Sequence, residues 1–457
     1  MTDKMRVLIL APGCDGTDVG ESWSCCQWVR GLAEHCDITL LTLQRPGRTP
    51  MAQQLPNVEV VSWNDIYWGG RLERFSSMLK PGYFRFYRNA RRWIRTALKQ
   101  GRTFDVMHQL GPLALRYPSP AVGFKVPLII GPLAGSLETP PAFQADCGKA
   151  PWYTRLRNLD QLRLKFDPWL RNTYRSADVV IGVAPYVKEL LKGIPLARFE
   201  VAAETGVHDV APTARRLEDR GPELRLLYVG RVIRTKGLRD LVQAMSLLAD
   251  VPNLTLDAVG MGEDLAACRE LAVKLNLEHR VRFHGRLPRA DVETMYAQAD
   301  VFVFPSFREP SGNVVFEALS HGLPVITTDR GGPGYVVDDE SGIRVAADNP
   351  AQLAQDLASA IRRLAADAEM RDRLAKGAAQ RARQLALWSN KINGMVDLYR
   401  NVIQQPGTAV KNVMTNSGSA LHIAVPHAAL ASTSVTGGWP ILPSRRCLNI
   451  RSGDFQS

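Results

Sequence analysis

The sequence contains no long hydrophobic run. No stretch of its 457 residues reaches the roughly 18–20 consecutive apolar residues that a membrane-spanning helix needs. The apolar run near the N-terminus, Val7–Leu10, is too short for the hydrophobic region of a signal peptide, and glycine and aspartate follow it. We therefore expect a cytoplasmic protein without a membrane span or a secretory leader.

Several motifs that would define other protein classes are also missing. The seven cysteines are odd in number and form no Cys-x-x-Cys pair, so we expect reduced thiols rather than a disulfide framework. No Walker loop is present. The glycine loop Val259–Glu263 lacks the pattern of a dinucleotide site, because Leu265 stands just after it at the position of the third glycine. The sequence therefore argues against an NAD-dependent dehydrogenase.

Acidic residues are scarce in two basic stretches that carry much of the net charge of +12. The stretch Arg71–Arg102 holds ten basic residues and a single acid, Glu73, and Trp152–Arg175 is also basic. Aromatic residues interleave with the cations in both. One interpretation is docking on an anionic membrane surface. The other is a pair of solvated helix faces whose aromatic residues belong to the core. Nucleic acid is not expected, because no binding motif accompanies the charge.

What the sequence does contain is a regular alternation of short apolar runs with longer helical patterns. This alternation is typical of parallel sheets covered by helices, and its two sets of strands predict two doubly wound α/β domains. A polar stretch, Asp209–Pro222, separates the sets. The expected strands are Val7–Leu10, Ile38–Leu43, Val58–Val61, Val106–His108, Leu128–Ile130 and Val179–Val183, then Leu226–Val229, Leu254–Val259, Val281–His284, Val301–Phe304 and Val325–Thr327.

The C-terminal part has a different character. Helical spacing continues after Ala351, and a last helix is expected at Trp388–Ile403. Beyond Gln405 small and polar residues dominate, which predicts disorder. The expected organisation is an N-terminal domain over 1–210, a second domain over 222–385, a C-terminal helix over 386–405 and a disordered tail over 406–457.

Ligands of such sheets bind at the carboxyl ends of the strands, and several loops there carry suitable residues. The first loop has Gly16 and Gly20 just before a helix, where backbone amides can approach a phosphate, although a tight surface turn is an equal alternative. In Gly230–Gly237, Arg231 and Lys236 are positioned to neutralise a diphosphate.

Three further side chains complete the candidate site. His108 ends an expected strand and is a candidate proton donor or acceptor, with a structural histidine as the alternative. In the segment Glu309–Glu317 two carboxylates stand eight positions apart, after a buried strand and around the start of a helix. Carboxylates accept hydrogen bonds from vicinal hydroxyls, and helix N-termini bind anions. A ligand with sugar hydroxyls at its ends and phosphates between them fits this pattern.

These residues carry a resemblance to a known family. Arg231, Lys236 and the Glu309/Glu317 pair, followed by His321–Ile326, resemble the retaining family 4 glycosyltransferases, also called group 1 glycosyltransferases. The resemblance is specific over about 226–345 and looser in the N-terminal half. It implies the GT-B fold, in which two Rossmann-like domains face each other across a cleft. It also implies an acceptor-binding N-terminal domain, a donor-binding second domain, and a C-terminal helix that returns toward the first.

The resemblance also implies roles for individual residues. Glu309 would hold the hydroxyls of the donor sugar, Glu317 the ribose hydroxyls, and Arg231 with Lys236 the diphosphate. The remaining implied positions are His108 beside the transferred sugar, Gly312 and Asn313 with amides near sugar or phosphate, and Gly262 with Arg286 along the base. His108, Glu309, Arg231 and Lys236 are thus the candidate catalytic residues. Gly16 and Gly20 join the candidate donor site.

The sequence departs from the family pattern in three places. Ser311 and Asn313 stand where an aromatic and an aliphatic residue are usual, which predicts a more polar sugar pocket. Gly20-Glu21-Ser22 is the nearest match to the usual Gly-Gly-x-Glu. No Asp-x-Asp triad stands at a strand end, so neither a metal nor any cofactor besides the donor substrate is expected, and Arg231 with Lys236 would take over the electrostatic role.

The sequence thus predicts a retaining, metal-independent transferase of the hexosyltransferase type. It would move a sugar from a UDP- or GDP-linked donor to a lipid-linked or membrane-proximal glycan, as in exopolysaccharide or lipopolysaccharide synthesis, at the inner face of the cell membrane. Two alternatives stay open: another GT-B enzyme of sugar nucleotides, such as an epimerase or phosphorylase, and a non-catalytic lipid-binding partner subunit.

Overall fold

The computed structural model describes residues 4–67, 76, 79–135, 137–147, 158–211 and 223–404. The described residues all belong to one compact unit. Most of the expected break at 209–222 and the whole expected tail after 405 lie outside the described residues. So do parts of the two basic stretches, at 71–75, 77–78 and 152–157.

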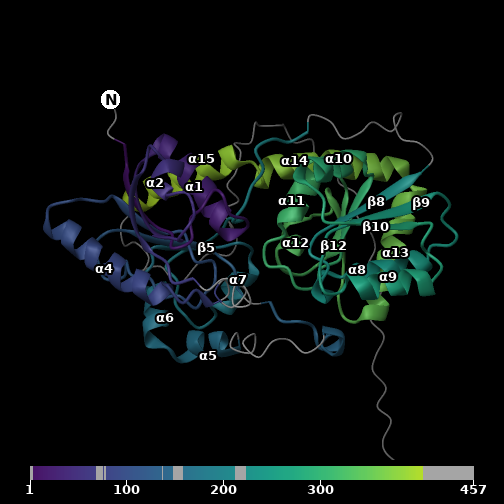
Figure 1. The fold of residues 1–457 in the computed structure, drawn as a ribbon, viewed down its shortest axis with the longest axis horizontal. Helices are drawn as coiled ribbons and strands as arrows, with labels where there is room; N and C mark the ends of the chain where they lie inside the picture. The colour runs from purple at the N-terminus through teal and green to yellow at the C-terminus, as the bar shows by residue number, and fades with distance from the viewer. Residues whose placement is uncertain are drawn as a thin grey trace, which may run out of the picture. The chain divides into compact units, whose positions relative to one another are not determined.

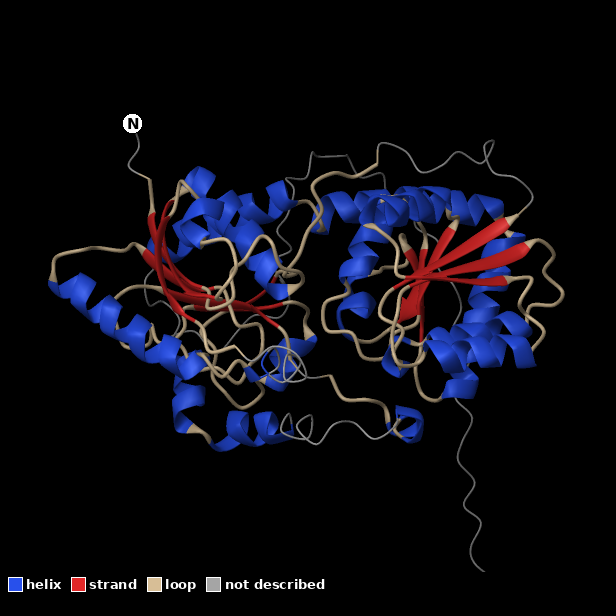
Figure 2. Ribbon diagram, in the orientation of Figure 1, coloured by secondary structure: helices blue, strands red, loops and turns tan. Residues whose placement is uncertain are grey.

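The N-terminal domain is built on a seven-stranded sheet with the order β3-β2-β1-β4-β5-β6-β7, and every pairing is parallel (Figures 1 and 2). Strands buried on both faces are apolar almost throughout, which explains their unbroken apolar runs. The strands are β1 (Arg6–Leu10), β2 (Asp37–Gln44), β3 (Glu59–Asn64), β4 (Val106–Gln109), β5 (Leu128–Leu133), β6 (Val179–Gly182) and β7 (Phe199–Val201).

Successive residues of β1 point to opposite faces of this sheet, and each face has its own core. Val7 and Ile9 pack in a cluster with α1 (Glu21–His35) and α15 (Trp388–Gln404). Leu8 and Leu10 pack in a second cluster on the other face. The helices on that other face are α4 (Tyr83–Lys99), α5 (Asn158–Phe166), α6 (Pro168–Arg175) and α7 (Tyr186–Leu190). The short α2 (Met51–Gln54) packs in the first cluster through Met51.

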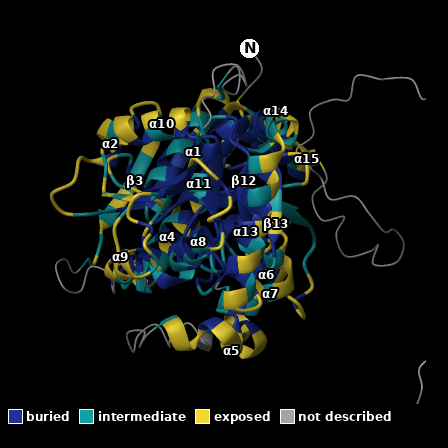
Figure 3. Ribbon diagram, turned by 90° about the vertical axis from the view of Figure 1, so that its right-hand side faces the viewer, coloured by how far each residue is buried: buried dark blue, intermediate teal, exposed yellow. Residues whose placement is uncertain are grey.

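The second domain repeats this plan with a six-stranded parallel sheet of order β10-β9-β8-β11-β12-β13 and one continuous core (Figure 3). The strands are β8 (Leu224–Val229), β9 (Leu254–Val259), β10 (Val281–Gly285), β11 (Val301–Phe304), β12 (Val325–Thr328) and β13 (Gly342–Val345). The helices are α8 (Leu238–Ser246), α9 (Leu265–Lys274), α10 (Arg289–Gln298), α11 (Asn313–Ser320), α12 (Gly331–Val336), α13 (Pro350–Ala366) and α14 (Ala368–Leu385).

Two segments depart from the order of the sequence. Helix α15 follows the second domain but packs on α1 and β4 of the first, as the expected returning helix does. Conversely, a short segment between β5 and α5 contributes Phe143 to the core of the second domain, where its ring centroid lies 4.1 Å from that of Phe307. The predicted pair of Rossmann-like domains and the returning helix are therefore confirmed.

Candidate active site

Four loops meet at the carboxyl edge of the second sheet, and they pack so closely that glycine is required. A Cβ on Gly260 would lie 1.8 Å from the carbonyl oxygen of Gly230, and one on Gly262 would lie 2.0 Å from that of Val232. Gly331 has a φ of 62°, and a Cβ there would lie 2.2 Å from the carbonyl oxygen of Glu309. A Cβ on Gly237 would lie 2.1 Å from the carbonyl oxygen of Pro305, so the backbones after β8, β9, β11 and β12 all pack together at this edge.

Lys236 and Glu309 form an ion pair at this edge. Lys236 Nζ donates to Glu309 Oε2 and lies 3.4 Å from the carbonyl oxygen of Arg308. The other carboxylate oxygen of Glu309 accepts from the amides of Ser311 and Gly312, each at 3.3 Å. Burial raises the pKa of Glu309, but Lys236 and these two amides outweigh it, so the pKa lies below its ordinary value. Glu309 is therefore a fixed carboxylate.

The start of α11 lies beside this pair. Gly312, with a φ of 82°, is the N-cap residue, and no side chain caps the helix. The first amides of α11 are thus not occupied by a capping side chain, which is the arrangement that binds anions. Asn313 is the first helical residue, and its Oδ1 is buried without a hydrogen-bond partner.

Glu317 lies on the same helix but is held by a different set of partners. Arg289 donates to its Oε1 at 2.7 Å, and the Tyr296 hydroxyl donates to its Oε2 at 3.1 Å. Arg231 and Arg286, which follow β8 and β10, have exposed side chains. In the structure Glu309 contacts both Lys236 and Gly312 directly. Glu317 has separate partners on α10, and the exposed Arg231 and Arg286 follow strands of the same sheet.

The candidate residues of the first loop lie in the N-terminal domain. The amide of Gly16 donates to Gln54 Oε1 at 2.7 Å, and a Cβ on Gly16 would lie 3.1 Å from the Cys26 sulfur. Gly20 has a φ of 65° and is the N-cap residue of α1. Both glycines therefore serve local needs of the β1–α1 loop, and their contact with a donor stays a prediction.

His108 is fully buried, with both ring nitrogens engaged. Nε2 lies 2.7 Å from the carbonyl oxygen of Gly131, so it carries the proton, and Nδ1 lies 2.6 Å from the Tyr399 hydroxyl, from which it accepts. Burial lowers the pKa of His108 to about 4. This geometry favours the structural histidine over the catalytic one, since neither nitrogen is open to a sugar.

The buried imidazole predicts a loss of stability in acid. Above pH 6.5 the ring is neutral in both folded and unfolded chains, but below it only the unfolded chain takes up the proton. The free energy of unfolding should therefore fall by about 3 kcal/mol from this group between pH 6.5 and 4. Urea unfolding of the wild type and of His108→Gln over this range measures it. An equal acid loss in the variant would contradict the assignment.

Glu204 and Arg234 are buried ionisable residues that were not anticipated from the sequence. Glu204 follows the short edge strand β7; burial raises its pKa to about 8, aided by Glu21 and Glu309, while hydrogen bonds from Ser311 and Asn313 oppose the rise. Glu204 therefore lies beside the loop of Glu309. Arg234 is buried between Asp240 and Asp146. The position of Glu204 just after a strand could have marked it as a candidate site residue. That strand, β7, was not among the strands expected from the sequence.

Within the described residues, no group of three or more His, Cys, Asp or Glu side chains could hold a metal ion. In the same part of the chain, no helix is both long and apolar enough to cross a bilayer.

Comparison with known proteins gives matches over both domains. Residues 20–203 match the model of the glycosyl transferase 4-like domain, and residues 213–381 match that of glycosyl transferases group 1. A lipopolysaccharide core biosynthesis glycosyltransferase, LpsE of Rhizobium meliloti, is 30% identical over 47% of this chain and 62% of its own length. A D-inositol 3-phosphate glycosyltransferase of Corynebacterium urealyticum is 32% identical over 39% of this chain and 43% of its own. The chain thus spans about half the length of the curated relatives it matches.

Solved structures share the fold over most of the chain. Sucrose-phosphate synthase of Thermosynechococcus elongatus aligns with a TM-score of 0.59 at 21% identity, covering 88% of this chain and 100% of the other. HepE of Anabaena, solved in complex with UDP, aligns with a TM-score of 0.60 at 17% identity, covering 87% and 100%. The two family models, the two parallel sheets and the returning helix together establish that the chain belongs to the group 1 glycosyltransferases of GT-B fold.

Proposed function

We propose that the protein transfers a sugar from a nucleotide diphosphate donor, UDP- or GDP-linked, to a hydroxyl of a lipid-linked or membrane-proximal glycan. The observation that carries this proposal is the fixed Glu309 carboxylate, paired with Lys236 and set at the uncapped start of α11. A carboxylate suits the hydroxyls of the donor sugar, and the lysine and helix amides suit the diphosphate. Glu317 would hold the ribose, and Gly262 with Arg286 would border the base.

The reaction we propose proceeds with retention and without a metal. The bond between the anomeric carbon and the diphosphate oxygen breaks, and its electron pair stays on the diphosphate. The acceptor oxygen forms its new bond on the same face and gives its proton to the departing phosphate. Lys236 and Arg231 would stabilise the charge that develops on this leaving group. For His108 a role at the transferred sugar is the weaker proposal, given its engaged nitrogens.

Nucleotide binding tests the donor assignment directly. UDP or GDP should raise the melting temperature of the protein, since a ligand that binds only the folded state stabilises it, while NAD should leave it unchanged. UDP is favoured by the structural likeness to HepE, which was solved with UDP. A rise in melting temperature with NAD, but with neither UDP nor GDP, would contradict the proposal. Product analysis from a panel of sugar nucleotides then separates transfer from epimerisation or phosphorolysis.

Peripheral binding to an anionic membrane is supported by the two-sided character of α4. One side of the helix is buried in the core through Tyr83, Phe86, Ala90, Ile94 and Ala97. On the opposite side five exposed cations recur at helical spacing, Arg85, Arg88, Arg92, Arg95 and Lys99. Three exposed aromatic side chains would add apolar contacts with the lipid: Phe84 of α4, Phe166 of α5 and Trp169 of α6. Trp169 packs against Tyr87 of α4. The aromatic residues of the stretch are thus partly core, as the alternative held, while the cations are free to face lipid.

Removing three of these cations should release the protein from vesicles. Arg88→Gln/Arg92→Gln/Arg95→Gln should weaken binding to phosphatidylglycerol vesicles about 100-fold, at about 1 kcal/mol for each charge near the surface. Cosedimentation measures this loss. The matched control is Lys274→Gln/Arg282→Gln/Arg373→Gln, which removes three exposed cations of the second domain. Equal losses in both variants, or binding unaffected by salt, would assign α4 a role in solubility alone.

A further inference from the structure

The carboxylate of Glu317 is held between two residues of α10. The Tyr296 hydroxyl donates to its Oε2 at 3.1 Å, and Arg289 donates to its Oε1 at 2.7 Å. A carboxylate offers about four acceptor positions, and these two donors use one on each oxygen. The side chain of Glu317 is 22% exposed. The arrangement therefore suits a ligand that presents two neighbouring hydroxyl groups, one to each oxygen.

Tyr296 is the rigid side of this arrangement. Its side chain is fully buried, and its ring stacks on that of His321 with the centroids 5.3 Å apart and an interplanar angle of 12°. Phe302 packs against the same ring, with the centroids 5.7 Å apart. Burial, and next the negative charge of Glu317, raise the pKa of the Tyr296 hydroxyl well above its ordinary value. The hydroxyl therefore stays a hydrogen-bond donor, and the core fixes its position.

Arg289 is the charged side of the arrangement. It is the first residue of α10, and besides Glu317 it contacts Glu293 Oε1 at 2.5 Å. The other carboxylate oxygen of Glu293 lies 2.7 Å from His321 Nε2, just after the end of α11. These contacts join the two helices and hold the guanidinium beside Glu317.

The Arg289–Glu317 pair repeats the charge pattern of the Lys236–Glu309 pair, since each carboxylate has a cation of its own. A carboxylate without such a cation would repel a diphosphate bound in the same site. With it, the carboxylate can accept hydrogen bonds from hydroxyl groups while its charge is compensated. Exposed ion pairs contribute little to folding, and the Arg289 side chain is 65% exposed. The effect of Arg289 should therefore lie in ligand binding and not in stability.

We infer that Arg289 and Tyr296 are positioning residues for Glu317, and that together they make the donor site select a ribose over a 2′-deoxyribose. Tyr296 orients the carboxylate, and Arg289 both orients it and compensates its charge. A 2′-deoxyribose lacks one of the two neighbouring hydroxyl groups, so it gains less from a carboxylate held in this way. The inference rests on the proposed function for the place of Glu317 at the ribose, and it adds the two residues that prepare this carboxylate.

The test compares nucleotides that differ in one hydroxyl group. UDP with 2′-deoxy-UDP, and GDP with 2′-deoxy-GDP, are titrated against the full chain by isothermal titration calorimetry. We expect the wild type to bind one ribonucleotide about tenfold or more tightly than its deoxy counterpart, because a hydrogen bond to a charged group is lost. Tyr296→Phe removes only the hydroxyl that orients Glu317. This ratio should then fall to about threefold or less, with the affinity for the deoxynucleotide unchanged.

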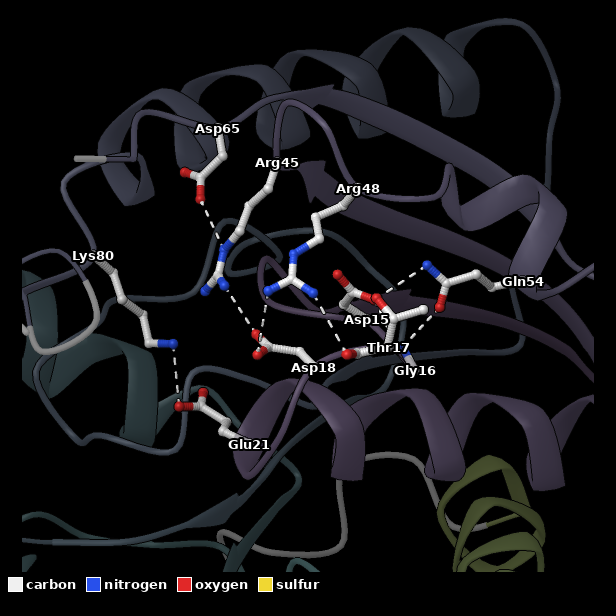
Figure 4. A network of polar contacts seen from close by, with 10 residues as sticks. All are labelled: Asp15, Gly16, Thr17, Asp18, Glu21, Arg45, Arg48, Gln54, Asp65 and Lys80. Carbon is white, nitrogen blue, oxygen red and sulfur yellow. Dashed lines mark hydrogen bonds and ion pairs between the residues drawn. The ribbon is translucent and has the colours of Figure 1, made fainter. Parts of the chain in front are cut away.

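Arg289→Gln separates orientation from charge. The ratio should fall as in Tyr296→Phe, but the deoxynucleotide should also bind about threefold more weakly, because Glu317 is then an uncompensated negative charge. In a Glu317→Gln background that charge is gone, so Arg289→Gln should have no further effect. The matched control is Arg48→Gln, which removes an exposed arginine that lies 4.0 Å from Asp18 in the first domain (Figure 4). This control should leave the ratio and both affinities unchanged.

Two results would overturn the inference: a wild type that binds ribonucleotide and deoxynucleotide equally, or a ratio that neither Arg289→Gln nor Tyr296→Phe lowers. Failure of the proposed function looks different, because the wild type would then bind neither UDP nor GDP. Melting temperatures verify that each variant is folded. If the inference holds, Arg289→Gln loses the ratio at an unchanged melting temperature, which a merely structural role would not produce.

Discussion

Glu309→Gln is expected to lower the turnover of sugar transfer about 100- to 1000-fold while the protein stays folded. The substitution keeps the size of the side chain and removes the charge that pairs with Lys236 and orders the amides of Ser311 and Gly312. Loss of one preorganised electrostatic contact in an active site commonly has an effect of this order. Transfer kinetics with a saturating donor measure the turnover, and circular dichroism shows whether the variant is folded.

A double-mutant cycle shows whether Glu309 and Lys236 act as one unit. If they do, Glu309→Gln/Lys236→Met should be little worse than either single variant, since residues that act together are strongly non-additive. Glu278→Gln, an exposed glutamate of the same domain, is the matched control and should keep full activity. Full transfer by Glu309→Gln would refute the assignment of this site.

Arg234→Met is expected to destabilise the protein by about 3–5 kcal/mol, the usual result of leaving a buried charge without its partner. Arg234 donates to both oxygens of Asp240, at 2.5 and 3.0 Å, and to Asp146 at 3.1 Å. Its guanidinium also lies 5.4 Å from the ring centroids of both Phe143 and Phe307. Chemical unfolding at pH 7 gives the free energy directly.

The control for this prediction removes both members of the pair. Arg234→Met/Asp240→Leu leaves no buried charge behind, so it should be more stable than Arg234→Met alone. Acid should also help the single variant, because burial already raises the pKa of Asp240, and removing Arg234 raises it further. Stability lost through a raised carboxyl pKa returns as the pH falls. A single variant as stable as the wild type would show that the pair is dispensable.

The fold could be predicted from the sequence because most strands are buried on both faces. All eleven expected strands are present, each an apolar run such as Val301–Phe304. The two that were missed, β7 and β13, lie at sheet edges. β7 has only three residues, Phe-Glu-Val, and β13 contains glycine and arginine. Edge strands need no apolar run, so periodicity carries little signal for them.

The candidate site was predictable where a side chain acts through its own loop. Lys236 and Glu309 fall at the ends of strong strands, and the structure brings them together. The role of His108 was not predictable, because its hydrogen-bond partners lie far away in the sequence. Tyr399 is 291 positions away and Gly131 is 23 positions away. Glu204 was missed for the same reason: its neighbours Ser311 and Asn313 belong to the other domain. Burial and long-range partners are properties of the fold, and no local pattern reports them.

The return of α15 to the first domain constrains how this chain can be recombined with its relatives. Tyr399, Met395 and Val396 of α15 complete the core that Val7 and Ile9 begin. A chimera that exchanges the N-terminal domain at a single junction near residue 210 would join a foreign sheet to a native α15 and mismatch that core. Exchanges of the N-terminal domain therefore need a second junction before Trp388, so that α15 is inherited together with the sheet on which it packs.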